Sequence, residues 1–595
     1  MPAEDGEARR KLIDESIVSR ITDREEKRIS GLLDISGLLD KPNYKPAQSF
    51  SPQPVEFDAV AMVSSPVIMK GVYGSRTPGA RSCGISYLGG EPVESVSAHG
   101  YERIEVDLEQ VVPGSSYGPS IEHYEQIQDN PFMRVSDHPL STFSIDVDTA
   151  SYANVRRYLS LGSLPPADAV RIEEMINYFN YDYASPKDNR PFATHLEAAV
   201  CPWNKKHSLV RIAIKGKEMV REERPVCNLV FLLDVSGSMQ NQNKLPLVKR
   251  ALKMLVKNLN GKDRVAIVVY AGASGLVLSP TSCADERAIE DALNRLKAGG
   301  STNGGAGIDL AYATALEHFQ KDGVNRVILC TDGDFNVGTT QTGDLVRMVE
   351  ERAAKGVFLS VLGFGMGNYK DSMLEKLADK GNGNYAYIDT FSEARKVLVE
   401  QLSGTLVTIA KDVKIQVEFN PARVAEYRLI GYENRMLRKE DFNDDTKDAG
   451  EIGAGHNVTA FYEVVPAGES SDQKPLVDPL RYQSEAGEKT KLSSSKELLT
   501  VKIRYKQPDG DVSEKLEFPL ADRIVKFNEA TPDFQFVSSV ASFGMLLRDS
   551  KHKGNATYGA VIETAMASLG ADRFGYRKEF IDLVRNAKAL AGESD

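Results

Sequence analysis

The sequence predicts an α/β fold: a doubly wound, mainly parallel sheet inserted in an antiparallel β-sandwich, with helical segments before and after it. Apolar strands alternate with amphipathic helices from residue 225 to residue 405, which is typical of a parallel sheet covered by helices on both faces. Strand-like segments of alternating polarity stand on both sides of this block, at 191–224 and 406–530. A domain inserted into a sandwich explains both flanks at once.

Size and composition limit the classes of protein that fit. The 595-residue chain is too long for one hydrophobic core, which predicts several domains. A hydrophobic content of 41% and a charged content of 26% are those of a globular protein. The formal net charge of -11 and the absence of a basic stripe argue against a nucleic acid partner. Apolar windows are too short for a transmembrane segment.

Residues 1–118 are weakly patterned, with short helical possibilities at 13–39 and a stretch rich in Pro, Gly and Ser at 41–118, which predicts a weakly ordered region or linker. The start of the chain is highly charged and lacks the apolar stretch of a secretory signal, so the sequence indicates a cytoplasmic protein unless a leader is missing. The cysteines contain no CxxC pair and predict neither a zinc site nor a disulfide framework. They stand far apart, at Cys83, Cys201, Cys227, Cys283 and Cys330.

Order is predicted to begin near residue 120. Residues 119–190 predict a mainly helical segment, with a strand at 142–147 and two helices after it. The first helix is capped near Asp148 or Thr149, and the second, at 167–179, contains the amphipathic run RIEEMINYF. Strands within 191–224 then form the first part of the sandwich.

The two segments after the α/β block complete the predicted architecture. Residues 406–530 hold further strands of alternating polarity, which complete the sandwich. Residues 531–595 predict C-terminal helices at 534–547, 558–569 and 573–590.

Oxygen-bearing side chains gather where strands of the α/β block end. Asp234, Ser236 and Ser238 follow the apolar run VFLL, Thr302 stands in the loop GGSTN, and Asp332 follows the strand NRVILC. Ligands of doubly wound sheets bind at the carboxyl ends of strands, so these side chains could meet. Carboxylates and hydroxyls without His or Cys suit Mg²⁺, with Mn²⁺ or Ca²⁺ as alternatives, and suit zinc poorly.

These motifs resemble a known family. D-V-S-G-S, the threonine of G-G-S-T-N and T-D-G, in this order, are similar to the metal-ion-dependent adhesion site (MIDAS) of von Willebrand factor A-type (VWA) domains, whose fold is Rossmann-like. The resemblance covers about residues 225–405. It implies that Ser236, Ser238 and Thr302 bind Mg²⁺ directly, and that Asp234 and Asp332 bind it through water or in alternation with a ligand.

The flanking segments resemble the extensions of a group of bacterial VWA-domain proteins. The similar stretches are STFSIDVDTASYANVRR, RIEEMINYF, GYENRMLRKEDF and GHNVTAFYEVVP. They widen the resemblance to about residues 120–590. Members of this group often carry export or lipoprotein signals, which implies the periplasm or cell envelope if a leader is missing here.

The expected function is metal-dependent protein binding without catalysis. Phosphatases with an aspartyl nucleophile place a second acid two residues after the first, where this chain has Ser236. The run DVSGSM also lacks the first glycine of the G-x-S-x-G motif of serine hydrolases. We therefore expect an adhesion or scaffold module that binds a carboxylate of a partner protein. The alternatives are a metal-assisted hydrolase of phosphate esters, with Asp234 as nucleophile or ligand, and a structural protein of an envelope assembly.

Overall fold

The computed structural model describes most of the chain after its first 123 residues. The described residues are 124–593 apart from 146–147, 221–222, 301–303, 334–341, 366–370, 448, 469–494 and 509. The weakly ordered region predicted for residues 1–118 therefore lies outside the described residues. Within the described part, no helix is long and apolar enough to span a membrane.

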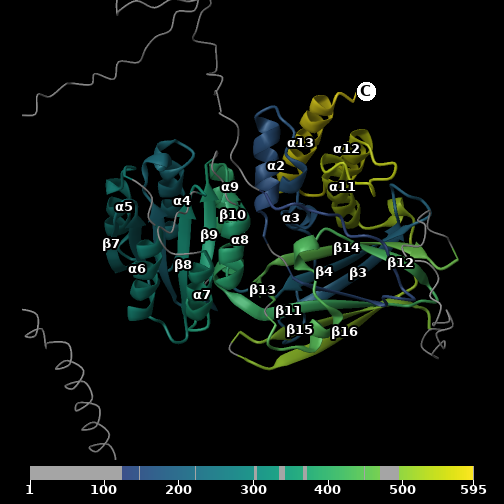
Figure 1. The fold of residues 1–595 in the computed structure, drawn as a ribbon, viewed down its shortest axis with the longest axis horizontal. Coiled ribbons are helices and arrows are strands. Elements are labelled where there is room, and N and C mark those ends of the chain that lie inside the picture. The colour runs from purple at the N-terminus through teal and green to yellow at the C-terminus, as the bar shows by residue number, and fades with distance from the viewer. Residues whose placement is uncertain are drawn as a thin grey trace, which may run out of the picture. The chain divides into compact units, whose positions relative to one another are not determined.

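The α/β block forms one six-stranded sheet in the order β10-β9-β8-β5-β6-β7. All neighbouring strands run parallel except β7, which is antiparallel to β6 at one edge. Helices cover both faces of the sheet (Figure 1). The predicted doubly wound, mainly parallel sheet is confirmed. Its strands are β5 (Cys227–Asp234), β6 (Arg264–Tyr270), β7 (Ser274–Ser282), β8 (Val324–Thr331), β9 (Phe358–Phe364) and β10 (Tyr385–Ile388), and its helices are α4 (Leu245–Lys257), α5 (Glu286–Arg295), α6 (Gly304–Glu317), α7 (Thr342–Ala353), α8 (Asp371–Lys380) and α9 (Phe391–Arg395).

The central strand β5 shows why this apolar run forms a strand. Side chains alternate between the two faces of a sheet, and here both faces are covered. Leu229, Phe231 and Leu233 pack into the core on one face, and Val230 and Leu232 into the core on the other. All five are fully buried. Each burial contributes about 1.5–3 kcal/mol, so these five side chains hold β5 firmly in the centre of the sheet.

Two antiparallel sheets enclose the core of the sandwich. One has the order β1-β12-β14-β4-β3, and the other has the order β13-β11-β15-β16, with β2 also paired to β11. Strands from before and after the α/β block therefore share one sheet, which confirms the predicted insertion. The strands are β1 (Met133–Arg134), β2 (Leu140–Ser144), β3 (Phe192–Val200), β4 (Ser208–Gly216), β11 (Thr408–Phe419), β12 (Val424–Ile430), β13 (Gly450–Gly453), β14 (Asn457–Pro466), β15 (Glu497–Lys506) and β16 (Ser513–Ala521).

The segment 119–190 contributes to two layers at once. Its strands β1 and β2 belong to the sandwich, while α2 (Ala150–Ser160) and α3 (Ile172–Asn177) pack against the C-terminal helices. Figure 1 shows α2 and α3 beside α11, α12 and α13. The ring of Phe179, just after α3, makes edge contacts with Tyr152 of α2 and with Phe536 and Phe580 of the C-terminal helices. The C-terminal helices are α11 (Pro532–Leu547), α12 (Tyr558–Ala567) and α13 (Tyr576–Ala591).

The last helical segment of the α/β block is less regular than the sequence pattern indicates. After α9, residues Lys396–Glu400 form a π-helical turn, and α10 (Leu402–Leu406) follows. The N–H of Gln401 donates to the carbonyl of Lys396 at 2.9 Å, five residues back. The Lys396 side chain is fully buried and donates to the carbonyl of Tyr178 at 2.6 Å. The π-helical turn therefore lies where the end of the α/β block packs against the residues that follow α3.

Gly453, at the end of β13, allows two backbones to touch where α10 meets the sandwich. A Cβ at this position would lie 1.8 Å from the carbonyl oxygen of Gly404. We expect Gly453→Ala to lower the free energy of unfolding by about 1–3 kcal/mol, because the backbones must separate. Thermal unfolding of the purified chain measures this. Gly343→Ala is the matched control, since Gly343 lies in α7 with open space around its Cβ position and should be neutral or slightly stabilising. Equal midpoints for the two variants would contradict the prediction.

Candidate functional site

Asp234 and Asp332 stand at the carboxyl ends of adjacent central strands. Asp234 is the last residue of β5, and Asp332 directly follows β8, which is paired with β5. The chain continues from β5 to β6 on one side and from β8 to β9 on the other, so the connections after β5 and β8 lead in opposite directions. This is the switch point at which open α/β sheets bind their ligands. The structure therefore places both aspartates where the sequence predicted them.

The Asp234 carboxylate is buried and only partly satisfied. Its Oδ1 accepts the N–H of Ser236 at 2.8 Å, while its Oδ2 is buried and makes no well-formed hydrogen bond with the described residues, with the Tyr270 hydroxyl near the carboxylate. Burial raises the pKa of Asp234 to about 6, and the nearby charge of Asp332 acts in the same direction. Hydrogen bonds from Ser236 and the Tyr270 hydroxyl act in the opposite direction. A bound cation would satisfy this oxygen and compensate the buried negative charge.

The two serines form a pair beside this carboxylate. Their Oγ atoms are 2.9 Å apart, with Ser236 buried and Ser238 exposed. A short 3-10 turn, Gly237–Gln240, carries Ser238, and the fully buried Met239 anchors that turn in the domain core. The hydroxyls thus extend from the buried Asp234 toward solvent. This geometry leaves the site open on one side.

The loop before α6 is tied to the Asp234 loop. The N–H of Gly299 donates to the carbonyl of Val235 at 2.8 Å, and the N–H of Gly237 donates to the carbonyl of Gly300 at 3.0 Å. Thr302, the fifth predicted site residue, lies outside the described residues. Its predicted role as a metal ligand therefore stays a prediction.

Lys244 is a site residue that the sequence reasoning missed. Its ammonium donates to Oδ2 of Asp332 at 2.8 Å, and both side chains are buried. The aliphatic stem of Lys244 passes over Gly365, where a Cβ would lie 2.3 Å from its Cε. Lys244 directly precedes α4, and a cation is unfavourable at a helix N-terminus. That mismatch was a signal that this lysine has a partner elsewhere.

The donors that meet here are carboxylate and hydroxyl oxygens. Asp234 ends β5, Ser236 and Ser238 stand in the loop that follows, and Asp332 follows the neighbouring strand β8. The described residues contain no group of three or more His, Cys, Asp and Glu that could hold a metal ion. A metal at this edge would thus depend on the serine hydroxyls as well. The orphaned Oδ2 of Asp234 and the serine pair fit a hard divalent cation, and offer no imidazole or thiolate for zinc.

Comparisons with known proteins agree with this fold. The family model described as "von Willebrand factor type A domain" matches residues 228–401, and one described as "von Willebrand factor" matches residues 119–211. The α/β block is therefore a VWA domain. VWA domains commonly mediate protein–protein interactions. A third family model, described as "Uncharacterized protein YfbK, C-terminal", matches residues 404–590.

The flanking matches define the family of the whole chain. The chain belongs to the family of the uncharacterized protein YfbK of Escherichia coli strain K12, to which it is 46% identical over 480 residues, 79% of this chain and 82% of the relative. The predicted bacterial VWA protein with extensions at both ends is thus confirmed. The uncharacterized protein sll0103 of Synechocystis is 32% identical over 185 residues, 31% of this chain and 43% of the relative. Among solved structures, the von Willebrand factor type A protein from Catenulispora acidiphila is 14% identical with a TM-score of 0.38, and the alignment covers 68% of this chain and 91% of that chain.

Proposed function

We propose that this chain is a non-enzymatic, metal-ion-dependent protein-binding module that captures an acidic side chain of a partner. Mg²⁺ is the proposed ion, held by Asp234, Ser236, Ser238, Thr302 and Asp332. The observation that carries the proposal is the buried Asp234 carboxylate, whose Oδ2 makes no well-formed hydrogen bond with the described residues and which lies beside a solvent-facing serine pair. Membership of a VWA family, whose domains are usually involved in protein interactions, supports it.

The proposed metal ligands have different roles. When bound, Mg²⁺ supplies an electrophilic centre with a position for a carboxylate oxygen. The neutral hydroxyls of Ser236 and Ser238 would contact the ion without cancelling its charge. Asp234 and Asp332 would balance that charge from the buried side. The exposed side, at Ser238, would admit the carboxylate of the partner.

Metal titration tests the site itself. We expect Mg²⁺ and Mn²⁺ to bind the wild-type chain at one site by isothermal titration calorimetry. Ser236→Ala removes one neutral ligand and should weaken binding at least about tenfold. Ser279→Ala is the matched control, because Ser279 is an exposed serine on β7 of the same domain. Equal metal affinities in wild type and Ser236→Ala would overturn the metal site.

Acetate, a small carboxylate, distinguishes capture of a partner's carboxylate from a purely structural role of the metal. If a carboxylate completes the coordination, saturating acetate should raise the affinity for Mn²⁺, since linkage is reciprocal. An ion that only stabilises the fold would raise the melting temperature with no acetate effect, which would contradict the capture mechanism. Hydrolysis of p-nitrophenyl phosphate by wild type that is lost in Asp234→Asn would favour the phosphatase alternative instead.

A further inference from the structure

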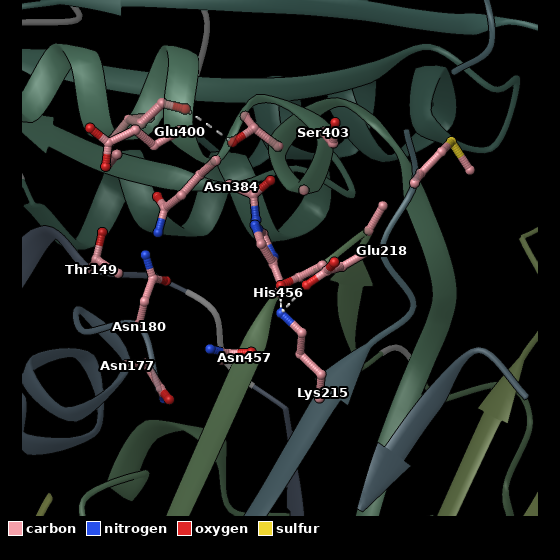
Figure 2. Close-up of a pocket in the computed structure, with 18 of the residues that line it drawn as sticks. Thr149, Asn177, Asn180, Lys215, Glu218, Asn384, Glu400, Ser403, His456 and Asn457 are labelled. Carbon is pink, nitrogen blue, oxygen red and sulfur yellow. Dashed lines mark hydrogen bonds and ion pairs between the residues drawn. The ribbon is translucent and has the colours of Figure 1, made fainter. Parts of the chain in front are cut away.

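A polar cavity of about 380 Å³ lies where the VWA domain, the sandwich and the N-terminal helical segment meet. We call it the junction pocket (Figure 2). Its wall is formed by the start of α2, the residues after α3, the end of β4, the residue before β10, the π-helical turn with α10, and the loop between β13 and β14. Three separate parts of the chain therefore present side chains to one space.

The junction pocket contains polar atoms that the chain itself leaves unsatisfied. Nδ1 of His456 and Oδ1 of Asn457 are buried and have no hydrogen-bond partner in the described part of the chain. Figure 2 shows Asn180 and Asn384 around the same space as His456. Buried polar groups cost free energy unless they are hydrogen-bonded, so a hydrogen-bonding occupant would stabilise this arrangement.

The charged groups around the junction pocket are compensated within the protein. The Lys215 ammonium lies 3.1 Å from the Glu218 carboxylate and donates to the carbonyl of Gly455 at 2.9 Å. The Glu400 carboxylate lies 3.4 Å from the Arg395 guanidinium and also accepts the Tyr576 hydroxyl at 3.0 Å. Burial lowers the pKa of His456 to about 4, so the imidazole is neutral at pH 7. No formal charge is therefore left for an ionic ligand to balance, and a charged ligand would lose its hydration without compensation.

The remaining groups are both donors and acceptors. A carboxamide offers one acceptor and two donors, and a hydroxyl offers both roles, which matches the adjacent hydroxyls of a sugar or polyol. Thr149 and Ser403 add hydroxyls to the amides of Asn180 and Asn384. The cavity volume corresponds to roughly a dozen waters at about 30 Å³ each, enough for a ligand of monosaccharide size.

From this geometry we propose that the junction pocket binds a neutral, polyhydroxylated ligand, a monosaccharide or a cyclic polyol. Such a ligand contacts α10, the β13–β14 loop and the start of α2 at once. It therefore holds the end of the VWA domain against the sandwich and the helical segment. This site is separate from the metal edge and does not depend on the proposed function.

Ligand-observed NMR with defined probes tests the proposal. D-glucose, N-acetyl-D-glucosamine and myo-inositol are titrated into the full chain, with sodium glutamate and sodium phosphate as charged comparisons. We expect saturable binding of at least one of the neutral probes, with a Kd of about 1 mM or tighter, and no binding of the charged ones. Polyols stabilise proteins generally by exclusion from the surface, so a melting shift alone does not count as binding.

Variants assign the binding to the junction pocket. Asn180 is exposed, so Asn180→Ala should fold normally and weaken binding about tenfold. Ser403→Leu fills the space from α10 and should abolish binding, with the circular dichroism spectrum as a check of folding. Asn555→Ala, at an exposed asparagine outside the pocket, is the matched control. No saturable binding of a neutral probe, stronger binding of glutamate or phosphate, or binding unchanged in both pocket variants would overturn the proposal.

Discussion

Replacing Arg156 by methionine is expected to lower the free energy of unfolding by about 3–5 kcal/mol, because it leaves buried carboxylates without their counter-charge. Arg156, in α2, forms a bidentate pair with Asp389 at 2.5 and 2.8 Å and contacts Glu393 at 2.7 Å. Its other nitrogen contacts Glu579 of α13 at 3.0 Å. Of these three carboxylates, Glu579 is partly exposed and the other two, Asp389 and Glu393, are buried. Solvent therefore cannot replace the guanidinium at the two buried carboxylates.

The neighbouring Lys396 cannot take over this role fully. Burial lowers the pKa of Lys396 to about 7, and the charge of Arg156 acts in the same direction. Arg156→Met therefore restores charge to the Lys396 ammonium, which compensates Glu393 but leaves Asp389 without its bidentate partner. Methionine keeps the length of the arginine stem and removes only the charge and the hydrogen bonds. The measurement is the midpoint of thermal or urea unfolding, read by circular dichroism.

Two further variants decide whether lost charge compensation is the cause. Arg156→Met combined with Glu393→Gln removes one of the two buried carboxylates that lose their partner and should recover part of the loss. Arg585→Met removes a guanidinium from an exposed pair with Asp582 and should change stability by less than about 1 kcal/mol. If the double variant is no more stable than Arg156→Met, lost packing and not stranded charge explains the effect.

This network also shows why the α/β domain could be predicted and its side-chain contacts with the helical segment could not. The apolar run of β5 is buried on both faces, and that burial leaves a signal within a few residues. The partner of Arg156, by contrast, lies 233 residues away at Asp389. No local pattern encodes such a pair, because it depends on where α2 packs against the end of the VWA domain. The pairing of β2 with β11 was hidden for the same reason.

The candidate site divides in a similar way. Asp234, Ser236 and Asp332 could be found because loops at the ends of parallel strands meet by topology alone. Lys244 reaches the site only through its side chain, whose stem needs the open space above Gly365. Side-chain direction at a helix start is not visible in periodicity. The unfavourable place of Lys244 before a helix indicated a partner elsewhere, but not that the partner is Asp332.

We expect Lys244→Met to raise the affinity for Mg²⁺ and Mn²⁺ by about 10- to 100-fold. The Lys244 ammonium already occupies Oδ2 of Asp332 at 2.8 Å, so a divalent ion at this edge meets a positive charge and an engaged carboxylate. Repulsion between a single and a double charge about 5 Å apart costs about 2–3 kcal/mol at an effective dielectric of roughly 40–80. This prediction rests on the proposed metal site, and calorimetric titration measures it.

The same substitution should act in the opposite direction on the metal-free protein. Without the ammonium, Asp332 loses a buried charged partner, and the metal-free chain should be destabilised by about 2–3 kcal/mol. Adding Mg²⁺ should then stabilise Lys244→Met more than wild type. Lys257→Met, at the end of α4 in a largely solvent-exposed pair with Glu290 of α5, should change neither quantity. A lower metal affinity in Lys244→Met would mean that the ammonium orients Asp332 for the ion. A higher affinity with lower metal-free stability means that lysine and metal are alternative counter-charges for one carboxylate.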